Sequence, residues 1–217
     1  MILFVLDRKS FIRFVREFPA LCTAVRRRCG PMATPEGHIG EPTVEDGASV
    51  WRIARDSHVL DVNSSYSYLL WCRDFAATSA VTRDESGMAV AFVTGYIRPE
   101  QPGTLVIWQI AVDGDRRGRG LAGAMLDHLT ARLRSRSVLQ CMETTISAEN
   151  EASQRLFLSF AARHGASVER EPLFPARLFP DAHDSEHLYR IGPLAQPPPS
   201  APGTQYSETR RTRSVPS

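Results

Sequence analysis

The sequence predicts an α+β fold, an α/β/α sandwich in which a mixed, twisted sheet carries helices on both faces. One observation is the segment 104–132, where an apolar stretch rich in branched and aromatic residues runs through a basic, glycine-rich turn into a helical pattern. The other is the order of strand-like and helix-like patterns along residues 39–194, which reads β-α-α-β-β-β-α-β-α-β. We therefore expect one domain with helices packed on both faces of the sheet.

Composition excludes several classes of protein. The formal net charge is +2 and the arginines fall into separate groups, so we expect no nucleic-acid partner. No apolar run approaches the roughly 18 residues that a membrane span needs, and residues 2–6 lack a basic leader. The cysteines show no C-x-x-C pair, which is typical of reduced thiols. We expect a cytoplasmic protein without membrane contact.

The chain divides into three parts. Residues 1–38 mix apolar and basic residues and then become polar, so we expect a flexible N-terminal extension, with Met32 as an alternative to Met1 as the native start. Residues 39–194 carry the orderly patterns and form the domain. Residues 195–217 are rich in Pro, Ser and other polar residues, cannot build a core and are expected to be disordered.

The domain opens with a short strand and two helices. Thr43 and Asp46 form a capping-box pattern at the start of the first helix, and residues 60–75 contain a polar cap before the second. Residues 78–82 and 88–96 are β-prone and are joined by a polar turn that ends in glycine. This arrangement predicts a hairpin.

The second half of the domain alternates strands and helices. Residues 104–112 are almost wholly apolar, which suits a strand buried on both faces. The helix after the turn has an apolar residue at every fourth position, Leu121, Met125, Leu129 and Leu133. A strand over 137–146, a helix over 148–164 and a last strand over 187–191 follow. Residues 168–183, rich in Pro and Phe, are expected to form an ordered surface loop.

The glycine-rich turn, residues 116–120, has the chemistry of a phosphate site. Gly118 and Gly120 lack Cβ atoms and lie at the start of a helix, where free N–H groups and the positive end of the helix dipole attract anions. The spacing fits neither G-x-x-x-x-G-K-[ST] nor G-x-G-x-x-G. It fits R-x-x-G-x-A, with Arg117, Gly120 and Ala122, and predicts a pyrophosphate site.

This pattern resembles the signature of the GCN5-related N-acetyltransferases, in which the turn binds the pyrophosphate of acetyl-coenzyme A. Longer runs resemble the L-2,4-diaminobutyrate N4-acetyltransferases of ectoine synthesis: LDVNSSYSYLLWCRDF, FVTGYIRPE, WQIAVD, RGRGLAGAML, ETTISAENEASQRLF and the ending D-x-H-x-x-E-H-L-Y-R-I-G-P-L. The resemblance covers about residues 39–194. It implies the GCN5-related N-acetyltransferase fold, a homodimer, and transfer of the acetyl group to the 4-amino group of L-2,4-diaminobutyrate, giving N4-acetyl-L-2,4-diaminobutyrate and coenzyme A.

The resemblance also implies which residues bind acetyl-coenzyme A. Backbone groups of Ala111 and Val112 would hold the pantetheine arm, and amides of the same strand would face the oxyanion. Asn150 matches an asparagine that opens a helix beside the cofactor. The implied set is Ala111, Val112, Arg117, Gly118, Arg119, Gly120, Leu121, Ala122 and Asn150. Phe157 stands where the superfamily has a tyrosine that protonates the leaving thiolate, so this chain lacks that hydroxyl.

The amino-acid pocket implied by the resemblance is lined by Asp61, Tyr66, Trp108, His183 and Glu186. Carboxylates suit the ammonium groups of the substrate, and Trp108 offers an aromatic face to a cation. The 4-amino group of the substrate, its γ-amine, is largely protonated at neutral pH and must lose a proton before it can attack the thioester. Tyr66 and Glu186 are the candidates for accepting or relaying that proton. From the residues alone, Asp61 could be a helix cap, Trp108 a core aromatic, and a further carboxylate, Glu143, an exposed strand residue.

Three rival functions remain open. The same fold could act on another small amine, a polyamine, an antibiotic amine or a protein terminus, or it could bind coenzyme A without catalysis. The third rival rests on His183, Glu186 and His187, which spell H-x-x-E-H, a zinc-protease pattern that needs both histidines on a regular helix. Pro180 and a strand-like pattern disfavour a helix there, so we expect no metal.

Overall fold

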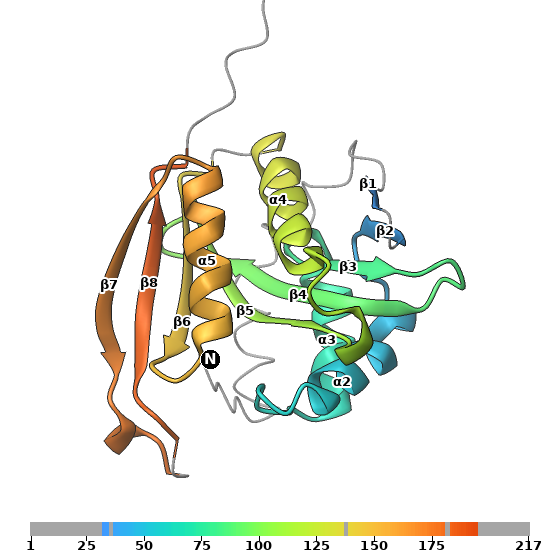
Figure 1. Ribbon diagram of the computed structural model, residues 1–217, viewed down its shortest axis with the longest axis horizontal. Helices are drawn as coiled ribbons and strands as arrows, with labels where there is room; N and C mark the ends of the chain where they lie inside the picture. The colour runs from blue at the N-terminus through green and yellow to red at the C-terminus, as the bar shows by residue number, and fades with distance from the viewer. Residues whose placement is uncertain (1–31, 35–36, 137–138, 181–182, 195–217) are drawn as a thin grey trace, which may run out of the picture.

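The structure is a computed structural model that describes residues 32–34, 37–136, 139–180 and 183–194 (Figure 1). Most of the predicted N-terminal extension, and all of the predicted tail over residues 195–217, lies outside these described residues. The domain predicted over residues 39–194 is almost completely described.

The centre of the fold is a mixed sheet with the strand order β1-β2-β3-β4-β5-β6-β8-β7. β5 and β6 run parallel, and the other neighbouring strands pair antiparallel. The strands are β1 Met32–Thr34, β2 Gly37–Gly40, β3 Ala80–Arg83, β4 Ala89–Ile97, β5 Thr104–Val112, β6 Cys141–Ser147, β7 Ser167–Phe174 and β8 Glu186–Gly192. The predicted mixed sheet is confirmed.

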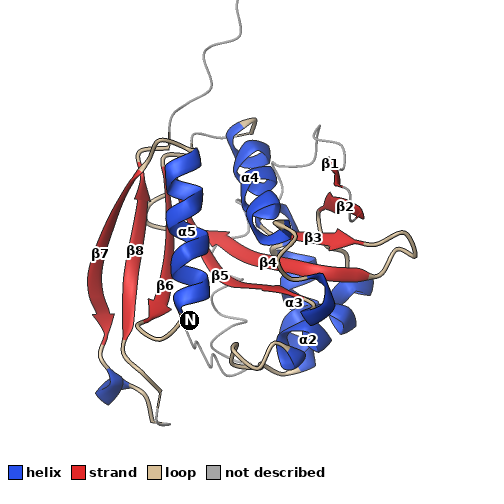
Figure 2. Ribbon diagram, viewed as in Figure 1, coloured by secondary structure: helices blue, strands red, loops and turns tan. Residues whose placement is uncertain are grey.

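Helices cover both faces of this sheet, as predicted (Figures 1 and 2). α4 (Leu121–Arg134) and α5 (Glu151–Arg163) pack on one face, where they share the larger hydrophobic core with strands β2 to β6 and β8. α2 (Gly47–Asp56) and α3 (Ser65–Asp74) pack on the other face against β3 and β4. The site described below forms on the α2–α3 face of the sheet.

Local sequence signals explain where the helices begin. Thr43 and Asp46 make the predicted capping box, in which the Thr43 N–H donates to Asp46 Oδ2 at 2.7 Å, and a short 3₁₀ turn then leads into α2. The residues predicted at every fourth position of α4 are all buried, namely Leu121, Met125, Leu129 and Leu133. This stripe fixes the side of α4 that faces the sheet.

The sheet extends further at both ends than the sequence predicts. β1 lies before the predicted domain start at residue 39 and pairs with β2. The prediction of a surface loop over residues 168–183 is wrong, because β7 pairs with β8 along Ser167–Phe174. β7 is an edge strand, mostly exposed, so it lacks an apolar stripe, and an edge position tolerates Pro172, which has no N–H to donate.

Two irregularities in the centre of the sheet shape the site. The parallel pairing of β5 with β6 ends at Ile107 and Thr144, and beyond this pair the two strands diverge (Figure 1). The pairing of β5 with β4 shifts register, since Thr94 faces Gln109 whereas Gly95 faces Ile107. Trp108 is therefore the extra residue of a β-bulge.

The bulge turns two successive side chains of β5 toward α3. In a regular strand Trp108 and Gln109 would point to opposite faces. Here Trp108 stacks on Trp71 of α3 and Gln109 is hydrogen-bonded to Tyr68 of the same helix. A polar and an aromatic side chain thus lie side by side where β5 leaves β6.

Candidate active site

The glycine-rich turn has the open backbone that an anion site needs. Gly118 and Gly120 have φ angles of +77° and +78°, and a Cβ at either position would meet no described atom within 4 Å. Gly120 is the N-cap of the 14-residue helix α4 and caps it without a side-chain hydrogen bond. The predicted residues Leu121 and Ala122 form the first turn of this helix. The N-terminal amides and the dipole of α4 therefore face an unobstructed turn.

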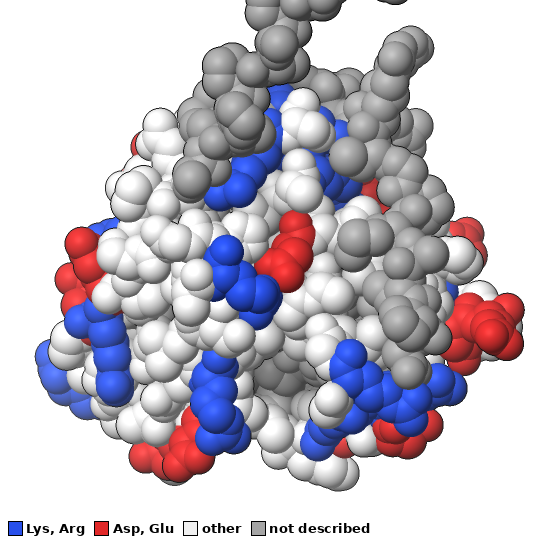
Figure 3. Space-filling model, turned by 45° about the horizontal axis from the view of Figure 1, so that its top comes forward, with Lys and Arg blue, Asp and Glu red and all other residues white. Residues whose placement is uncertain are grey.

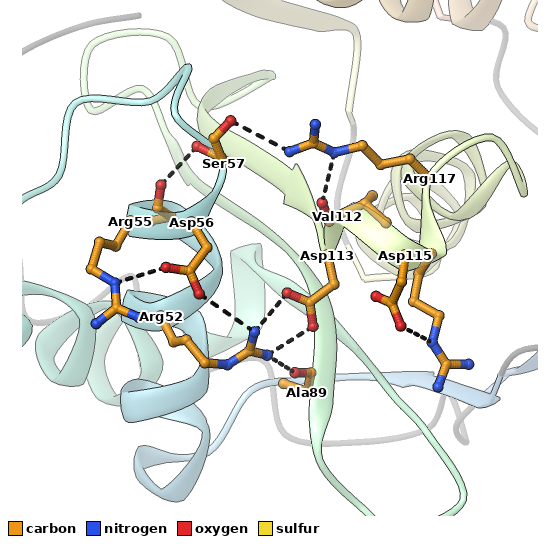
Figure 4. A network of polar contacts seen from close by, with 11 residues as sticks. Arg52, Arg55, Asp56, Ser57, Ala89, Val112, Asp113, Asp115 and Arg117 are labelled. Carbon is orange, nitrogen blue, oxygen red and sulfur yellow. Dashed lines mark hydrogen bonds and ion pairs between the residues drawn. The ribbon is translucent and has the colours of Figure 1, made fainter.

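Arg117 ties this turn to both sides of the site (Figure 4). Its Nε donates to the carbonyl oxygen of Val112 at 3.2 Å, and its Nη2 donates to the carbonyl oxygen of Ser57 at 3.4 Å. Val112 ends β5, and Ser57 follows α2. The Ser57 hydroxyl in turn accepts the N–H groups of Val59 and Leu60 in the loop toward α3. One arginine of the turn thus contacts both the end of β5 and the segment that follows α2.

A bidentate ion pair fixes the junction between β5 and the turn. Arg52 of α2 donates to Asp113 through Nη1 at 2.7 Å and through Nη2 at 2.8 Å (Figure 4). Arg119 bends back to the Asp115 carbonyl oxygen at 3.1 Å. The planar guanidinium of Arg52 matches the Asp113 carboxylate with two parallel hydrogen bonds, so the Arg52–Asp113 pair sets the orientation of the two side chains as well as their distance. α2 therefore holds the end of β5 in place.

The remaining predicted cofactor residues lie on either side of the divergence. Ala111 and Val112 are half-buried at the end of β5, beyond its pairing with β6. Asn150 is the N-cap of α5, and its Oδ1 accepts the Ser153 N–H at 3.0 Å. Phe157 is buried at 2% exposure within the core between α4, α5 and the sheet. The position where the superfamily has a tyrosine is therefore apolar here.

Three predicted substrate residues come together on the α2–α3 side. Asp61 lies in the loop between α2 and α3, His183 lies in the segment before β8, and Glu186 is the first residue of β8. His183 Nε2 is 3.3 Å from Asp61 Oδ2 and 3.8 Å from Glu186 Oε1. Glu186 is 1% exposed. Two carboxylates and an imidazole therefore share one site, although they come from opposite ends of the domain.

The aromatic residues of this region come from β5, from α3 and from the segment before β8. Trp108 is buried and stacks on Trp71 with ring centroids 4.5 Å apart and an angle of 18°. Phe179 stacks on the His183 ring at 4.3 Å. Tyr66 lies in the first turn of α3 and is 47% exposed. Trp108 is thus both packed and placed at the divergence of the strands.

Glu143 has a different surrounding from the exposed strand edge considered above. Its side chain is 3% exposed on β6, Arg98 Nη1 approaches Oε2 at 2.7 Å, and Arg190 Nε approaches Oε1 at 2.9 Å. A buried carboxylate between two arginines has its charge compensated within the sheet. This arrangement indicates a structural role.

The H-x-x-E-H pattern does not form a helical metal site. Glu186 and His187 belong to strand β8, so the two histidines are not one helical turn apart. In the part of the chain that the structure describes, no group of three or more His, Cys, Asp or Glu residues is arranged to hold a metal ion.

Charged side chains of both signs are distributed over the face of the domain that Figure 3 shows. Figure 3 shows basic side chains in several separate groups on the visible face, with acidic and uncharged residues between them. None of the helices described has the length and apolar character needed to cross a bilayer.

Sequence reasoning missed Tyr68 and Gln109, which link α3, β5 and the Asp61 loop. Gln109 did carry a signal, because it is a single amide within an otherwise apolar strand. A buried amide needs hydrogen-bond partners, and here those partners belong to the site.

Comparisons with known proteins show the family to which this chain is related. The pattern of the acetyltransferase (GNAT) family matches residues 48–161. The L-2,4-diaminobutyric acid acetyltransferase of Streptomyces anulatus is 63% identical over 158 residues, which cover 72% of this chain and 90% of that protein. The corresponding protein of Nocardia farcinica is 51% identical over 155 residues, covering 71% of this chain and 79% of that protein.

Solved structures show the same fold. Diaminobutyrate acetyltransferase EctA from Paenibacillus lautus, in complex with L-2,4-diaminobutyric acid and coenzyme A, is 36% identical with a TM-score of 0.68, covering 72% of this chain and 95% of that one. Ard1 from Thermoplasma volcanium, 21% identical with a TM-score of 0.57, covers 71% of this chain and 96% of its own and shares the fold alone. The chain therefore belongs to the acetyltransferase (GNAT) family and, within it, to the L-2,4-diaminobutyric acid acetyltransferases.

Proposed function

We propose that this chain transfers the acetyl group of acetyl-coenzyme A to the 4-amino group of L-2,4-diaminobutyrate, a step of ectoine biosynthesis, with the activity residing in residues 39–194. The observation that carries the proposal is that one domain holds two sites suited to opposite charges. The open glycine-rich turn lies at the start of α4, and Asp61, His183 and Glu186 come together on the α2–α3 face. An acidic site suits a substrate with two ammonium groups.

The cofactor side holds the thioester. The pyrophosphate binds the N-terminal amides of α4 with Arg117 and Arg119, and the pantetheine arm follows Ala111 and Val112 along β5. Asn150 meets the arm from the start of α5. Amides of β5 face the carbonyl oxygen as it becomes an oxyanion, and such preorganised donors lower the barrier because they need no reorganisation.

The substrate side orients the amino acid. Asp61 binds the α-ammonium group, and the γ-amine lies against Trp108, where fewer charges hold its proton. Tyr66 relays that proton to Glu186, which is buried beside His183: the Tyr66 hydroxyl gives its own proton to the carboxylate as it takes one from the ammonium group. The neutral nitrogen then attacks the thioester carbon, the C–S bond breaks, the thiolate leaves, and the nitrogen loses its second proton to solvent as the amide forms.

The leaving thiolate needs no tyrosine at position 157. A thiol with a pKa of about 8.5 is a tolerable leaving group as its anion, and it takes a proton from solvent afterwards. The buried, apolar position of Phe157 supports this route. A Phe157→Tyr enzyme is therefore expected to gain little activity.

The experiment incubates the full-length chain with acetyl-coenzyme A and L-2,4-diaminobutyrate, follows free thiol and assigns the product by NMR. Ornithine, lysine and spermidine run in parallel. Thiol release with diaminobutyrate and acetyl on the γ-nitrogen supports the proposal. Thiol release only with another amine refutes the assigned substrate. The absence of thiol release with every amine favours a coenzyme A-binding protein without catalysis.

We further propose a cytoplasmic homodimer that acts without nucleic-acid or membrane partners. The proposal follows the resemblance to the family and the mixed surface charge. Light scattering of the purified chain gives the molar mass, and a monomeric mass at micromolar concentration would refute the dimer.

A further inference from the structure

Two buried polar side chains lie directly behind the loop that carries Asp61. Tyr68 of α3 is completely buried and Gln109 of β5 is 2% exposed. The Tyr68 hydroxyl donates to Gln109 Oε1 at 3.1 Å. Burial raises the pKa of Tyr68, so its hydroxyl keeps the proton that it donates. This bond fixes the orientation of the amide, with its NH₂ group turned away from Tyr68.

The pair holds the backbone of the Asp61 loop at two points. Gln109 Nε2 donates to the Asp61 carbonyl oxygen at 2.9 Å, and the Asn63 N–H donates to the Tyr68 hydroxyl at 3.4 Å. The loop has no helix or strand to satisfy its backbone, so these two interior groups take that role. Asp61 is thereby fixed from behind while its carboxylate faces His183.

The β-bulge is what brings Gln109 to this place. Because Trp108 is the extra residue, Gln109 points toward α3 rather than into the core on the α4–α5 face. The same bulge therefore presents the aromatic face of Trp108 and supports the Asp61 loop.

We propose that Gln109, acting with Tyr68, is a positioning residue for Asp61 and so for the amino-acid substrate. The inference rests on the proposed function and names residues that determine how tightly that substrate binds. Gln109 contacts the backbone carbonyl oxygen of Asp61, whereas the Asp61 carboxylate faces His183. Loss of the Gln109 amide lets the loop that carries Asp61 move, and it leaves the Asp61 carbonyl oxygen without its buried hydrogen-bond donor.

The experiment compares Gln109→Met and Tyr68→Phe with the wild-type full-length enzyme. Methionine has a similar length without hydrogen bonds, and phenylalanine removes only the hydroxyl. We expect KM for diaminobutyrate to rise about tenfold in Gln109→Met and less in Tyr68→Phe, from the usual effect of a buried, broken hydrogen bond. KM for acetyl-coenzyme A should stay within about twofold, since the cofactor side is untouched.

A matched control separates positioning from general damage to the core. Thr82→Val removes a fully buried hydroxyl on β3, away from the Asp61 loop, and should leave both KM values unchanged. A double variant of Gln109→Met with Asp61→Asn tests whether the effect of Gln109 on KM for diaminobutyrate is exerted through Asp61. If Gln109 acts through Asp61, kcat/KM for diaminobutyrate in the double variant falls little below that of Asp61→Asn alone.

Three results would each overturn the positioning role of Gln109. Unchanged KM for diaminobutyrate in Gln109→Met, equal rises in both KM values, or full additivity with Asp61→Asn overturns the positioning role. Should Gln109→Met not fold, Tyr68→Phe decides by the same criteria. A wild-type enzyme inactive on diaminobutyrate refutes the proposed function, whereas an active wild type with unaffected variants refutes only this inference.

Discussion

Asp61 Oδ2 lies 3.3 Å from His183 Nε2, and this contact joins the α2–α3 loop to the segment before β8. The two segments belong to the two halves of the sheet that separate where β5 leaves β6. The contact therefore spans the divergence on the face that carries α2 and α3. Residues on either side of it can bind opposite ends of one small substrate.

Asp61→Asn should weaken binding of the amino acid. The change keeps the shape of the side chain and removes the charge that attracts an ammonium group, so KM for diaminobutyrate is expected to rise at least about tenfold. KM for acetyl-coenzyme A should not change. Initial rates with each substrate varied give both constants. Asp56→Asn, an exposed carboxylate paired with Arg55 at the end of α2, is the control, and an equal effect of both variants would contradict a specific role for Asp61.

Gly120→Ala should impair cofactor binding beyond its effect on stability. A residue with a side chain at φ +78° costs about 1 kcal/mol, and the new methyl group lies in the open turn. We expect KM for acetyl-coenzyme A to rise about tenfold. Gly87→Ala is the matched control, because Gly87 has φ +85° and equally open surroundings in the β3–β4 hairpin. If both variants raise this KM equally, the turn is not the phosphate site.

Glu143→Gln should destabilise the fold without changing substrate affinity. Removing the carboxylate leaves Arg98 and Arg190 without their shared partner, and because both arginines are partly exposed we expect a loss of about 2 kcal/mol in the free energy of unfolding. Urea titration measures it. Glu151→Gln, which breaks an exposed pair with Arg155, should cost less than about 0.5 kcal/mol. A large rise in KM for diaminobutyrate in Glu143→Gln would instead assign this residue to the site.

His128 should make the fold less stable at mildly acidic pH. Burial lowers the pKa of this histidine, neighbouring Arg132 lowers it further, and Glu41 partly opposes them. The unfolded chain binds a proton near pH 6.5 and the folded chain only at lower pH, so stability present above about pH 6.5 is lost as the pH falls. His128→Gln should show a smaller difference in unfolding free energy between pH 7.5 and pH 5.5.

The control for this pH effect is His58→Asn. His58 is exposed and has φ +55°, a conformation that asparagine tolerates. The slope of unfolding free energy against pH in this variant shows the effect of replacing a histidine at an exposed position and is the reference for His128→Gln. Equal slopes for wild type and His128→Gln would show that other groups carry the acid sensitivity.

The sequence predicted the elements whose apolar pattern reports burial. β5 spans the predicted residues 104–112, and the predicted stripe of α4 is buried. β7 was missed because an exposed edge strand with mixed charges and a proline has no such pattern. The bulge was also missed, because it depends on the pairing of β5 with β4, where a Cβ on Gly95 would approach the Val106 carbonyl oxygen to 2.7 Å.

The site was predictable in part for a similar reason. The turn at the start of α4 has a local spacing that can be read directly, whereas Asp61 and His183 are far apart along the chain and were grouped by the family resemblance. Gln109 escaped notice because its significance lies in which backbone atom it contacts. Only the folded register supplies that information.

The parallel pairing between β5 and β6 is short, and this affects how the cofactor can stabilise the domain. Four residue pairs join these strands, from Thr104 with Cys141 to Ile107 with Thr144, and the two halves of the sheet then part. If the cofactor arm lies along the end of β5, as proposed, it fills that opening and stabilises the joined state in proportion to its own affinity. The loaded enzyme would then resist unfolding more than the enzyme from which coenzyme A has departed.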